Sequence, residues 1–295
     1  PNACPVCGPQ VRFEWSASIV PDTGWNLQDV PDEGPIESAQ RVIAQGGIVA
    51  IKGLGGFHLA CDASNGAALA TLRDRKGRVD KPFAIMARDL ATARAIAHVD
   101  DDEAALLTSR ARPIVLLRKR AGSPLSDLVA PGNRMVGVML PYTPLHYLLL
   151  GAYPFDGSDC SDSSDSLTSD PLPPATCHLP PATLVLTSGN LSDEPIIKDD
   201  DEARERLTAL ADAFLLHNRE IYARCDDSVM RVFEGKELPV RRSRGYAPFP
   251  VKLPFSLPTT LAVGGELKAT FCLTRDNHAF MSQHIGDMEN LETLD

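Results

Sequence analysis

The spacing of apolar residues along the chain switches repeatedly between that of helices and that of strands. Pro35 suits the first turn of a helix whose apolar residues recur every three or four positions up to Gly46-Gly47. The continuous apolar run 48–51 then predicts a buried strand. The same reasoning predicts strands at 57–61, 83–87, 113–117, 183–187 and 213–216, and helices after the cap signal at 62–65 and at 89–97, 100–109 and 199–210. Interleaved helices and strands favour an α/β fold.

Beyond residue 220 the pattern is one of short strands joined by turns. The runs 228–233 and 238–244 flank Glu234-Gly235-Lys236-Glu237 and predict a hairpin. A proline-spaced linker is expected at 248–258, followed by a second hairpin at 261–282 that turns at Asp276-Asn277 and belongs to another domain. Upstream, the Ser-, Asp- and Pro-rich stretch 156–181 has the composition of a solvated loop inserted into the α/β domain.

The composition is that of a globular protein, with 43% apolar and 23% charged residues in a chain of 295. No apolar run approaches the roughly 20 residues that span a bilayer, and the N-terminus carries no secretion signal, which predicts a soluble cytoplasmic protein without membrane contact. The cysteines, seven in number and scattered, suit a reducing compartment. The net charge of −10 argues against a protein that coats nucleic acid but leaves room for a local basic cleft.

Cations nevertheless cluster in two places. The first cluster, 73–82, ends a predicted helix before Pro82, where its side chains can hold phosphate oxygens by charge-assisted bonds of roughly 1.5–3 kcal/mol each. A solvated helix end, whose cations suit the helix dipole, is the alternative interpretation. The second cluster, Arg241-Arg242-Ser243-Arg244-Gly245, either pairs with surface carboxylates or faces a polyanion such as a nucleoside triphosphate.

Two turns that follow predicted strands add candidate ligand contacts. Lys52-Gly53-Leu54-Gly55-Gly56 lets a ligand approach the backbone, although its spacing matches neither a Walker loop nor a dinucleotide-binding fingerprint. Thr187-Ser188-Gly189-Asn190 presents hydroxyl and amide groups at the end of a strand. Either motif alone is also typical of a simple tight turn. The polar segments 217–219 and 224–228 offer further contacts to a purine, a ribose or Mg²⁺.

Cys4-Pro5-Val6-Cys7-Gly8 has the spacing of a zinc knuckle. One such pair supplies two ligands, whereas a closed structural site has four, so the sequence predicts half of a Zn²⁺ site. A redox pair is the alternative, but no thioredoxin-like context surrounds these cysteines.

Taken in order, these motifs resemble the YrdC-like family over residues 33–254, and within it the HypF-type carbamoyltransferases. The motifs that carry the resemblance are Lys52 to Ala63, Lys76-Gly77-Arg78 with Lys81-Pro82, Ser188-Gly189-Asn190, the segments 215–219 and 226–228, and Arg242 to Pro248. The segments 264–268 and 282–287 resemble the start of the ASKHA-type domain that follows in HypF. The resemblance implies an α/β fold with a twisted mixed sheet and flanking helices at 33–255, between the end of a zinc module at 1–32 and the truncated ASKHA-type carbamoyl transferase domain at 256–295.

Such enzymes are expected to hydrolyse carbamoyl phosphate to carbamate and to join carbamate to ATP as a carbamoyl-adenylate, releasing pyrophosphate. The carbamoyl group then goes to the C-terminal cysteine of a HypE-type protein acceptor during maturation of nickel–iron hydrogenases. By this resemblance the chain is a carbamoyltransferase that keeps the adenylate-forming step and does not complete the transfer alone.

The resemblance also implies roles for individual residues. The residues expected to bind ATP, with Mg²⁺ sharing the neutralisation of charge, are Lys76, Arg78, Lys81, Ser188, Asn190, Arg242 and Arg244. Related enzymes that make threonylcarbamoyl-adenylate have a hydroxyl-rich stretch where this chain has Lys52 to Gly55. That departure favours a smaller substrate, with Lys52 and His58 expected near the carbamate.

Two other functions stay open. The first is a threonylcarbamoyl-adenylate synthase for tRNA modification, which would require threonine. The second is a YrdC-like RNA-binding module, which would bind RNA with an affinity that depends on salt. The acidic total charge weakens the second alternative and makes double-stranded RNA an unexpected partner.

Overall fold

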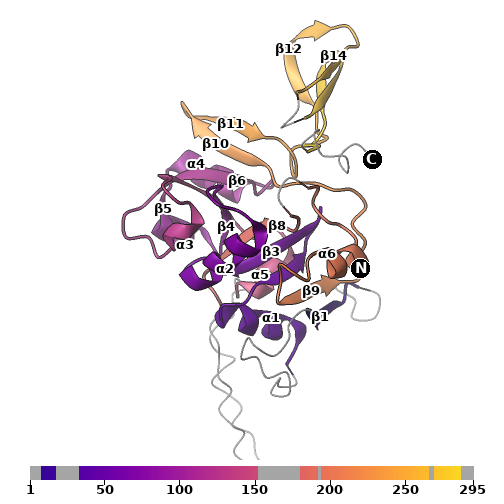
Figure 1. Ribbon diagram of the computed structural model, residues 1–295. Helices are drawn as coiled ribbons and strands as arrows, with labels where there is room; N and C mark the ends of the chain where they lie inside the picture. The colour runs from indigo at the N-terminus through magenta and orange to yellow at the C-terminus, as the bar shows by residue number, and fades with distance from the viewer. Residues whose placement is uncertain (1–7, 18–32, 152–179, 192–193, 266–268, 287–295) are drawn as a thin grey trace, which may run out of the picture.

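The computed structural model describes residues 8–17, 33–151, 180–191, 194–265 and 269–286 (Figure 1). In this part of the chain a large mixed sheet carries the first unit, and a smaller sheet follows it. The strands of the large sheet are β1 (Val11–Trp15), β2 (Val49–Lys52), β3 (Phe57–Asp62), β4 (Ala84–Ala87), β5 (Ala97–His98), β6 (Ile114–Lys119), β7 (Met135–Met139), β8 (Thr183–Ser188), β9 (Ala213–His217), β10 (Val229–Phe233) and β11 (Lys236–Arg241).

The strands lie side by side in the order β1-β9-β2-β3-β8-β4-β7-β6-β10-β11, with β5 paired to β6. The pairs β2–β9, β4–β7 and β6–β10 are parallel, and the other pairs are antiparallel. Strand β8 therefore lies between two groups of strands, β1-β9-β2-β3 and β4-β7-β6-β10-β11, and each group includes strands from the last third of the chain. The mixed sheet confirms the predicted α/β fold.

Local sequence signals explain where the helices begin and end. The helices are α1 (Pro35–Ala44), α2 (Gly66–Lys76), α3 (Leu90–Ile96), α4 (Asp101–Thr108), α5 (Pro144–Leu149) and α6 (Asp200–Arg206). Asn65 caps α2 by accepting hydrogen bonds from the backbone amides of Ala67 and Ala68, and Asp100 and Glu103 form a capping box at α4. Gly77 ends α2 in the left-handed conformation, at φ 62°.

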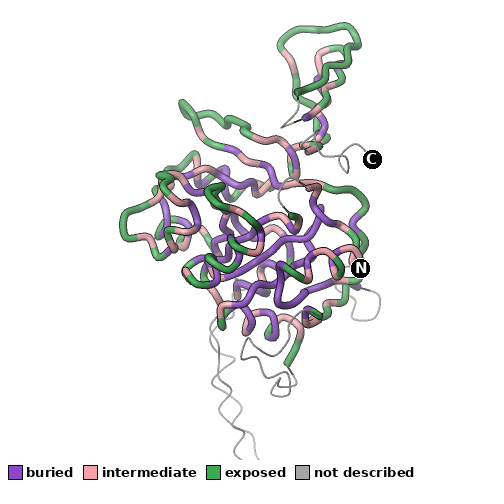
Figure 2. Tube along the Cα trace, viewed as in Figure 1, coloured by how far each residue is buried: buried purple, intermediate pink, exposed green. Residues whose placement is uncertain are grey.

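The two faces of the sheet pack against different helices because successive strand residues point to opposite sides. Ala50, Leu59 and Cys61 belong to a core that includes apolar residues of α2, α3, α4 and α6. Val49, Ile51 and Ala60 belong to a second core, with residues of α1 and α5. Figure 2 shows this burial in the central strands, whereas the β10–β11 hairpin reaches into solvent.

The second face is only partly covered. Its core includes Ile114 and Leu186, with Ala84 and Val229 packed at its margin. These residues also line an open pocket, so the sheet surface beyond α1 and α5 is the floor of a cleft. Gly137 of β7 contributes to this floor, where an added Cβ would lie 2.8 Å from the Ile114 side chain.

The smaller sheet differs from the prediction in two ways. Its strands are β12 (Val251–Leu257), β13 (Leu261–Val263) and β14 (Phe271–Met281), in the order β12-β14-β13, and Figure 1 shows it beyond the β10–β11 hairpin. The expected linker at 248–258 is wrong because 251–257 pairs with β14 as an edge strand that accommodates Pro254. The expected turn at Asp276-Asn277 is also wrong: Asp276 has φ 53° within β14, and the strand continues through it.

Some elements were not predicted. Strands β1 and β7 and helix α5 lie in segments whose apolar pattern is short or interrupted by Gly and Pro. The Ser-, Asp- and Pro-rich stretch predicted as a loop lies outside the described residues, apart from its last two positions. No helix in the described ranges has the length and apolar character needed to cross a membrane.

Candidate nucleotide site

The cleft has two connected parts. The larger, of about 390 Å³, lies over the ends and faces of strands β3, β8, β4, β7, β6, β10 and β11. The smaller, of about 230 Å³, lies beside the end of α2 and the turn after β8. Arg78, Lys81 and Ser188 line both parts. The cleft thus combines an apolar floor with cationic and hydroxyl groups at one end, a combination suited to a ligand with an anionic part.

At this end Lys76 joins two segments that are far apart in sequence. Its ammonium nitrogen lies 2.6 Å from the Ser188 carbonyl oxygen, 2.6 Å from the Asn190 carbonyl oxygen and 2.8 Å from Asn190 Oδ1. The Ser188 hydroxyl donates to the same Asn190 Oδ1 at 2.8 Å. The structure therefore brings together three residues that the sequence analysis placed in two separate motifs.

Arg78 is fixed beside this group. Its guanidinium donates to Thr187 Oγ1 at 2.8 Å and to the Lys81 carbonyl at 3.0 Å, and it lies over the ring of Phe83. The left-handed conformation of Gly77 reverses the chain between Lys76 and Arg78, so that both reach the smaller pocket. Lys81, exposed at the rim, lines both parts of the cleft.

Arg73 holds the loop that carries these cations. It is buried, and its guanidinium donates to the carbonyl oxygens of Leu128, Arg78, Val79 and Lys81. Its role is to shape the loop after α2, because its hydrogen bonds go to backbone groups.

Burial and mutual repulsion lower the pKa values of Lys76 and Arg78. The pKa of Lys76 falls to about 7, first because of burial and then because of the charges of Arg78 and Lys81. The pKa of Arg78 falls to about 10, again mainly through burial. A bound polyanion would relieve this repulsion, so these groups have electrostatic energy to gain from an anionic ligand.

The opposite wall of the larger pocket carries two carboxylates. Burial alone would raise the pKa of Asp227, but hydrogen bonding to His58 and the charge of Arg244 bring it far below its ordinary value. For Asp226, burial likewise raises the pKa, and the hydrogen bond with His284 and the charge of Arg241 outweigh it. Both aspartates are therefore ionised in a pocket whose other end is cationic.

Asp227 is the centre of a buried polar group. Its Oδ1 lies 2.6 Å from Arg244 Nε, and its Oδ2 lies 3.4 Å from His58 Nε2. The Arg244 guanidinium lies 3.5 Å from the centre of the Tyr142 ring, which packs edge-on against His146. Burial and the neighbouring His58 lower the pKa of His146 to about 3, so His146 is neutral at physiological pH.

The second cationic cluster lines the cleft through Arg241, whereas Arg242 and Arg244 were the two residues predicted to bind ATP. Arg244 donates its remaining hydrogen bonds to the carbonyls of Ala111 and Arg112, and Arg242 donates to those of Tyr246, Phe249 and Met281. Neither lines the two parts of the cleft. Arg241 does line the larger part, where its Nε donates to the Asp227 carbonyl at 3.0 Å.

Comparison with protein-family models identifies the family of the domain that contains this cleft. The family model for Sua5, YciO and YrdC, described as Telomere recombination, matches residues 41–243. The chain belongs to the Sua5–YciO–YrdC family. A second model, the HypF Kae1-like domain, matches residues 256–295, so the smaller sheet lies mostly within another domain type.

Relatives place this Sua5–YciO–YrdC domain close to HypF. Carbamoyltransferase HypF2 of Cupriavidus necator is 49% identical over 92% of this chain and 33% of its own length. Carbamoyltransferase HypF of Rhizobium leguminosarum bv. viciae is 46% identical over 88% of this chain and 32% of its own length. The chain spans about a third of the length of these curated relatives. The resemblance to HypF-type carbamoyltransferases is confirmed.

Solved structures agree with the sequence comparison. Full-length HypF in its phosphate- and nucleotide-bound form matches with a TM-score of 0.81 and 40% identity, over 99% of this chain and 34% of that one. HypF from T. kodakarensis matches with a TM-score of 0.80 and 40% identity, over 99% of this chain and 33% of that one. P. abyssi Sua5 complexed with L-threonine has a TM-score of 0.55 at 18% identity, over 71% of this chain and 54% of that one, which shows the shared fold alone.

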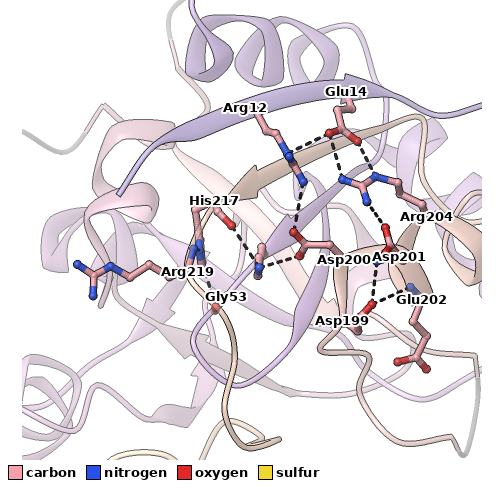
Figure 3. A network of polar contacts seen from close by, with 11 residues as sticks. Arg12, Glu14, Gly53, Asp199, Asp200, Asp201, Glu202, Arg204, His217 and Arg219 are labelled. Carbon is pink, nitrogen blue, oxygen red and sulfur yellow. Dashed lines mark hydrogen bonds and ion pairs between the residues drawn. The ribbon is translucent and has the colours of Figure 1, made fainter. Parts of the chain in front are cut away.

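Lys52 lies in a different environment from the cleft of this Sua5–YciO–YrdC domain. Its ammonium nitrogen lies 2.7 Å from Asp200 Oδ1 and 3.2 Å from the His217 carbonyl oxygen. Figure 3 shows the surrounding network, in which Arg12 and Glu14 of β1 face Arg204 and Asp200 of α6. Lys52 lines neither part of the cleft. This position argues for a structural role in tying β2 to α6.

His58, by contrast, does line the larger pocket. Its side chain is buried, its Nε2 faces Asp227, and its Nδ1 has no hydrogen-bond partner among the described residues. An added Cβ on Gly53 would lie 2.9 Å from that Nδ1, so the glycine leaves space that the imidazole uses. His58 therefore stays a candidate substrate contact.

A search of the described residues for a protein metal site gives a negative result. Among the described residues no group of three or more His, Cys, Asp or Glu side chains has the arrangement of a metal site. Cys4 and Cys7, predicted as zinc ligands, lie outside the described residues. The zinc prediction therefore stays a prediction.

Several cleft residues were not singled out from the sequence. Arg241 belongs to a predicted cationic cluster, but the alternation along β11 that points it into the cleft depends on the register of the hairpin. Asp226 and Asp227 lie in the segment 224–228, for which the sequence suggests a contact to a purine, a ribose or Mg²⁺ but no role for either aspartate. His284 comes from beyond the first unit, and no local sequence signal connects it to the cleft.

Proposed function

We propose that the cleft binds ATP and activates carbamate as a carbamoyl-adenylate, as one step of a HypF-type carbamoyltransferase. The observation that carries the proposal is the convergence of Lys76, Arg78, Ser188 and Asn190 at the junction of the two pockets. The carbamoyltransferase names of the relatives support the choice of carbamate as the second substrate.

In this proposal the triphosphate lies at the cationic end. Lys76, Arg78 and Lys81 hold phosphate oxygens, and Ser188 and Asn190 donate to phosphate or ribose. The apolar floor, which includes Leu116, Leu186 and Val229, receives the less polar part of the nucleotide. The rim position of Lys81 suits a cation that closes on the phosphates after binding.

The chemical contribution of the protein is positioning and charge neutralisation. Carbamate and ATP are both anionic, so a carbamate oxygen reaches the α-phosphorus only where cations offset the repulsion between them. Attack forms the bond from oxygen to the α-phosphorus and breaks the bond to the bridging oxygen, and pyrophosphate leaves. His58 lies at the pocket wall and is the side chain proposed to contact the carbamate.

Mg²⁺ is expected to enter with ATP, because this ion binds through substrate phosphates and one or two carboxylates rather than through a protein cage. The acceptor proposed for the carbamoyl group is a HypE-type protein. Zn²⁺ at Cys4 and Cys7 is proposed as a structural ion outside this cleft.

The decisive experiment is an assay of pyrophosphate release from ATP and Mg²⁺. One reaction contains ammonium bicarbonate, which supplies carbamate, and a parallel reaction contains threonine with sodium bicarbonate. Mass spectrometry identifies the adenylate in each. Release with ammonium bicarbonate, together with a carbamoyl-adenylate mass, is the expected result.

The other outcomes separate the alternatives. Release that requires threonine would instead indicate a threonylcarbamoyl-adenylate synthase. ATP binding without release in either reaction would contradict the activation step, and salt-sensitive binding of RNA in its place would favour an RNA-binding module.

A further inference from the structure

One residue of the larger pocket comes from the domain that follows. His284 lies in the segment 256–295 that matches the HypF Kae1-like domain, yet it lines the pocket of the preceding domain together with Asp226 and Arg241. Its Nδ1 lies 2.8 Å from Asp226 Oδ2. The His284 side chain keeps 13% of its surface exposed, so most of it is covered in this position.

A second contact joins the same two parts of the chain. The guanidinium of Arg242, which follows β11, donates to the carbonyl of Met281 at the end of β14. This bond lies three residues from His284 and uses a different partner from the first domain. The position of His284 in the pocket is therefore supported by a second contact between the two parts of the chain, three residues before it.

The pocket needs this contact for electrostatic reasons. Two adjacent ionised carboxylates lie in a cleft that, on the proposed function, receives the phosphates of ATP. Asp227 is offset by Arg244 at 2.6 Å and by His58 at 3.4 Å, both from the first domain. Asp226 has Arg241 at 4.0 Å, beyond hydrogen-bond range, and His284 at 2.8 Å.

We propose that His284 is a positioning residue that holds the Asp226 carboxylate by a hydrogen bond, and so makes ATP binding by the first domain depend on docking of the Kae1-like segment. The inference rests on the proposed function of the cleft. When the segment docks, Asp226 is turned toward the imidazole. When the segment withdraws, Asp226 keeps only its distant contact with Arg241 and repels the incoming phosphates. Nucleotide binding and domain docking then strengthen each other, because a coupling between two equilibria is reciprocal.

The test is a double-mutant cycle measured by titration of ATP with Mg²⁺ into this chain. His284→Ala is expected to weaken ATP binding by about tenfold, because a partly buried carboxylate loses its hydrogen-bond partner. Asp226→Asn is expected to bind ATP at least as tightly as wild type. The double variant is expected to match Asp226→Asn within about twofold, since without the negative charge His284 has no carboxylate to hold.

The matched control is His278→Ala, a substitution of the same kind in β14 at a residue outside the pocket lining. It is expected to leave ATP binding unchanged. Thermal unfolding of every variant separates loss of domain docking from loss of fold. A role for His284 in stability alone would appear as equal losses with Asp and with Asn at position 226, together with a lower unfolding temperature of both His284→Ala variants.

The results that overturn the proposal are distinct. Additive losses in the double variant with an unchanged unfolding temperature would mean that His284 contacts the nucleotide directly. Loss of binding in Asp226→Asn alone would identify Asp226 as a ligand of the Mg²⁺ ion. Unchanged ATP binding by His284→Ala would contradict the proposed coupling between ATP binding and docking of the Kae1-like segment. Failure of the wild-type chain to bind ATP would refute the proposed function itself, before any variant is compared.

Discussion

The two cationic clusters look alike in sequence and differ in structure. In the first, Arg73 is used to shape a loop, and Lys76, Arg78 and Lys81 face the cleft. In the second, Arg242 and Arg244 are held by carbonyl groups and Asp227, and Arg241 faces the cleft. The comparison teaches that charge density in a sequence does not identify the ligand-binding cation. What decides is where folding places each side chain: Lys76 and Arg78 line the cleft although carbonyl oxygens also hold them, whereas Arg242 and Arg244 lie outside its lining.

The largest expected effect concerns the stability role assigned to Arg244. Replacing Arg244 by Ala leaves Asp227 ionised, buried and without its closest partner, so the free energy of unfolding should fall by about 3–5 kcal/mol. Urea denaturation monitored by fluorescence checks this value. A variant with wild-type stability and abolished ATP binding would instead restore the original prediction that Arg244 binds the triphosphate.

Next in size is the ligand-binding role assigned to Lys76. Lys76→Ala should weaken ATP binding by at least tenfold, since a charge-assisted phosphate contact contributes about 1.5–3 kcal/mol. Lys119→Ala removes the same kind of side chain from a partly exposed ion pair with Asp127 and serves as the control. Equal ATP affinities for the two variants would show that the first cluster is not the phosphate site.

The lowered pKa of Lys76, in the first cluster, predicts that ATP affinity depends on pH. In the free protein this ammonium loses its proton above about pH 7, whereas bound phosphates favour the charged form. Binding therefore takes up a proton, and ATP affinity should fall by up to about tenfold per pH unit between about pH 7.5 and 9.5. Calorimetric titrations in that range check the slope. Lys76→Gln should flatten it, and an unchanged slope in this variant would assign the titration to another group.

The smallest effect is expected at Arg241, the cation of the second cluster that faces the cleft. Its side chain is partly exposed, so Arg241→Ala should weaken ATP binding by only about threefold to tenfold. Arg231→Ala, on the exposed side of the same hairpin, is the control and should bind ATP as wild type does. A loss as large as that for Lys76→Ala would mean that both clusters hold phosphates equally.

Much of the fold could be predicted because local signals agree with the final structure. Asn65 caps α2, Gly77 ends it, and the apolar runs at 48–51 and 57–61 are buried strands. Strand β7, with Gly137 at its centre, carries no such strong signal, because its place in the sheet depends on partners distant in sequence. The segment 251–257 was predicted as a linker because Pro254 suggests a break, whereas an edge strand tolerates it.

Residues of the site could be predicted from the sequence only where they lie in short motifs. Lys76, Arg78, Ser188 and Asn190 were expected to act together, and they lie together. The partners of Lys52, which are Asp200 and the His217 carbonyl, come from segments about 150 residues away, so no local pattern indicated that this lysine is used for packing. The same reasoning applies to His284, whose contact depends on the placement of a second sheet.

The place of β8 in the sheet has a consequence for how the protein is made on the ribosome. Strands β2 and β3 can pair as soon as they emerge, and so can β6 and β7, but β8 lies between β3 and β4 and is translated about 100 residues after them. The nascent chain therefore carries two separate incomplete sheets until Thr183–Ser188 leaves the exit tunnel, and the edges at β2 and β6 stay unpaired until β9 and β10 follow. Codon usage that slows translation just before β8 should increase aggregation of nascent chains, and chaperones that cover strand edges should matter most in that interval.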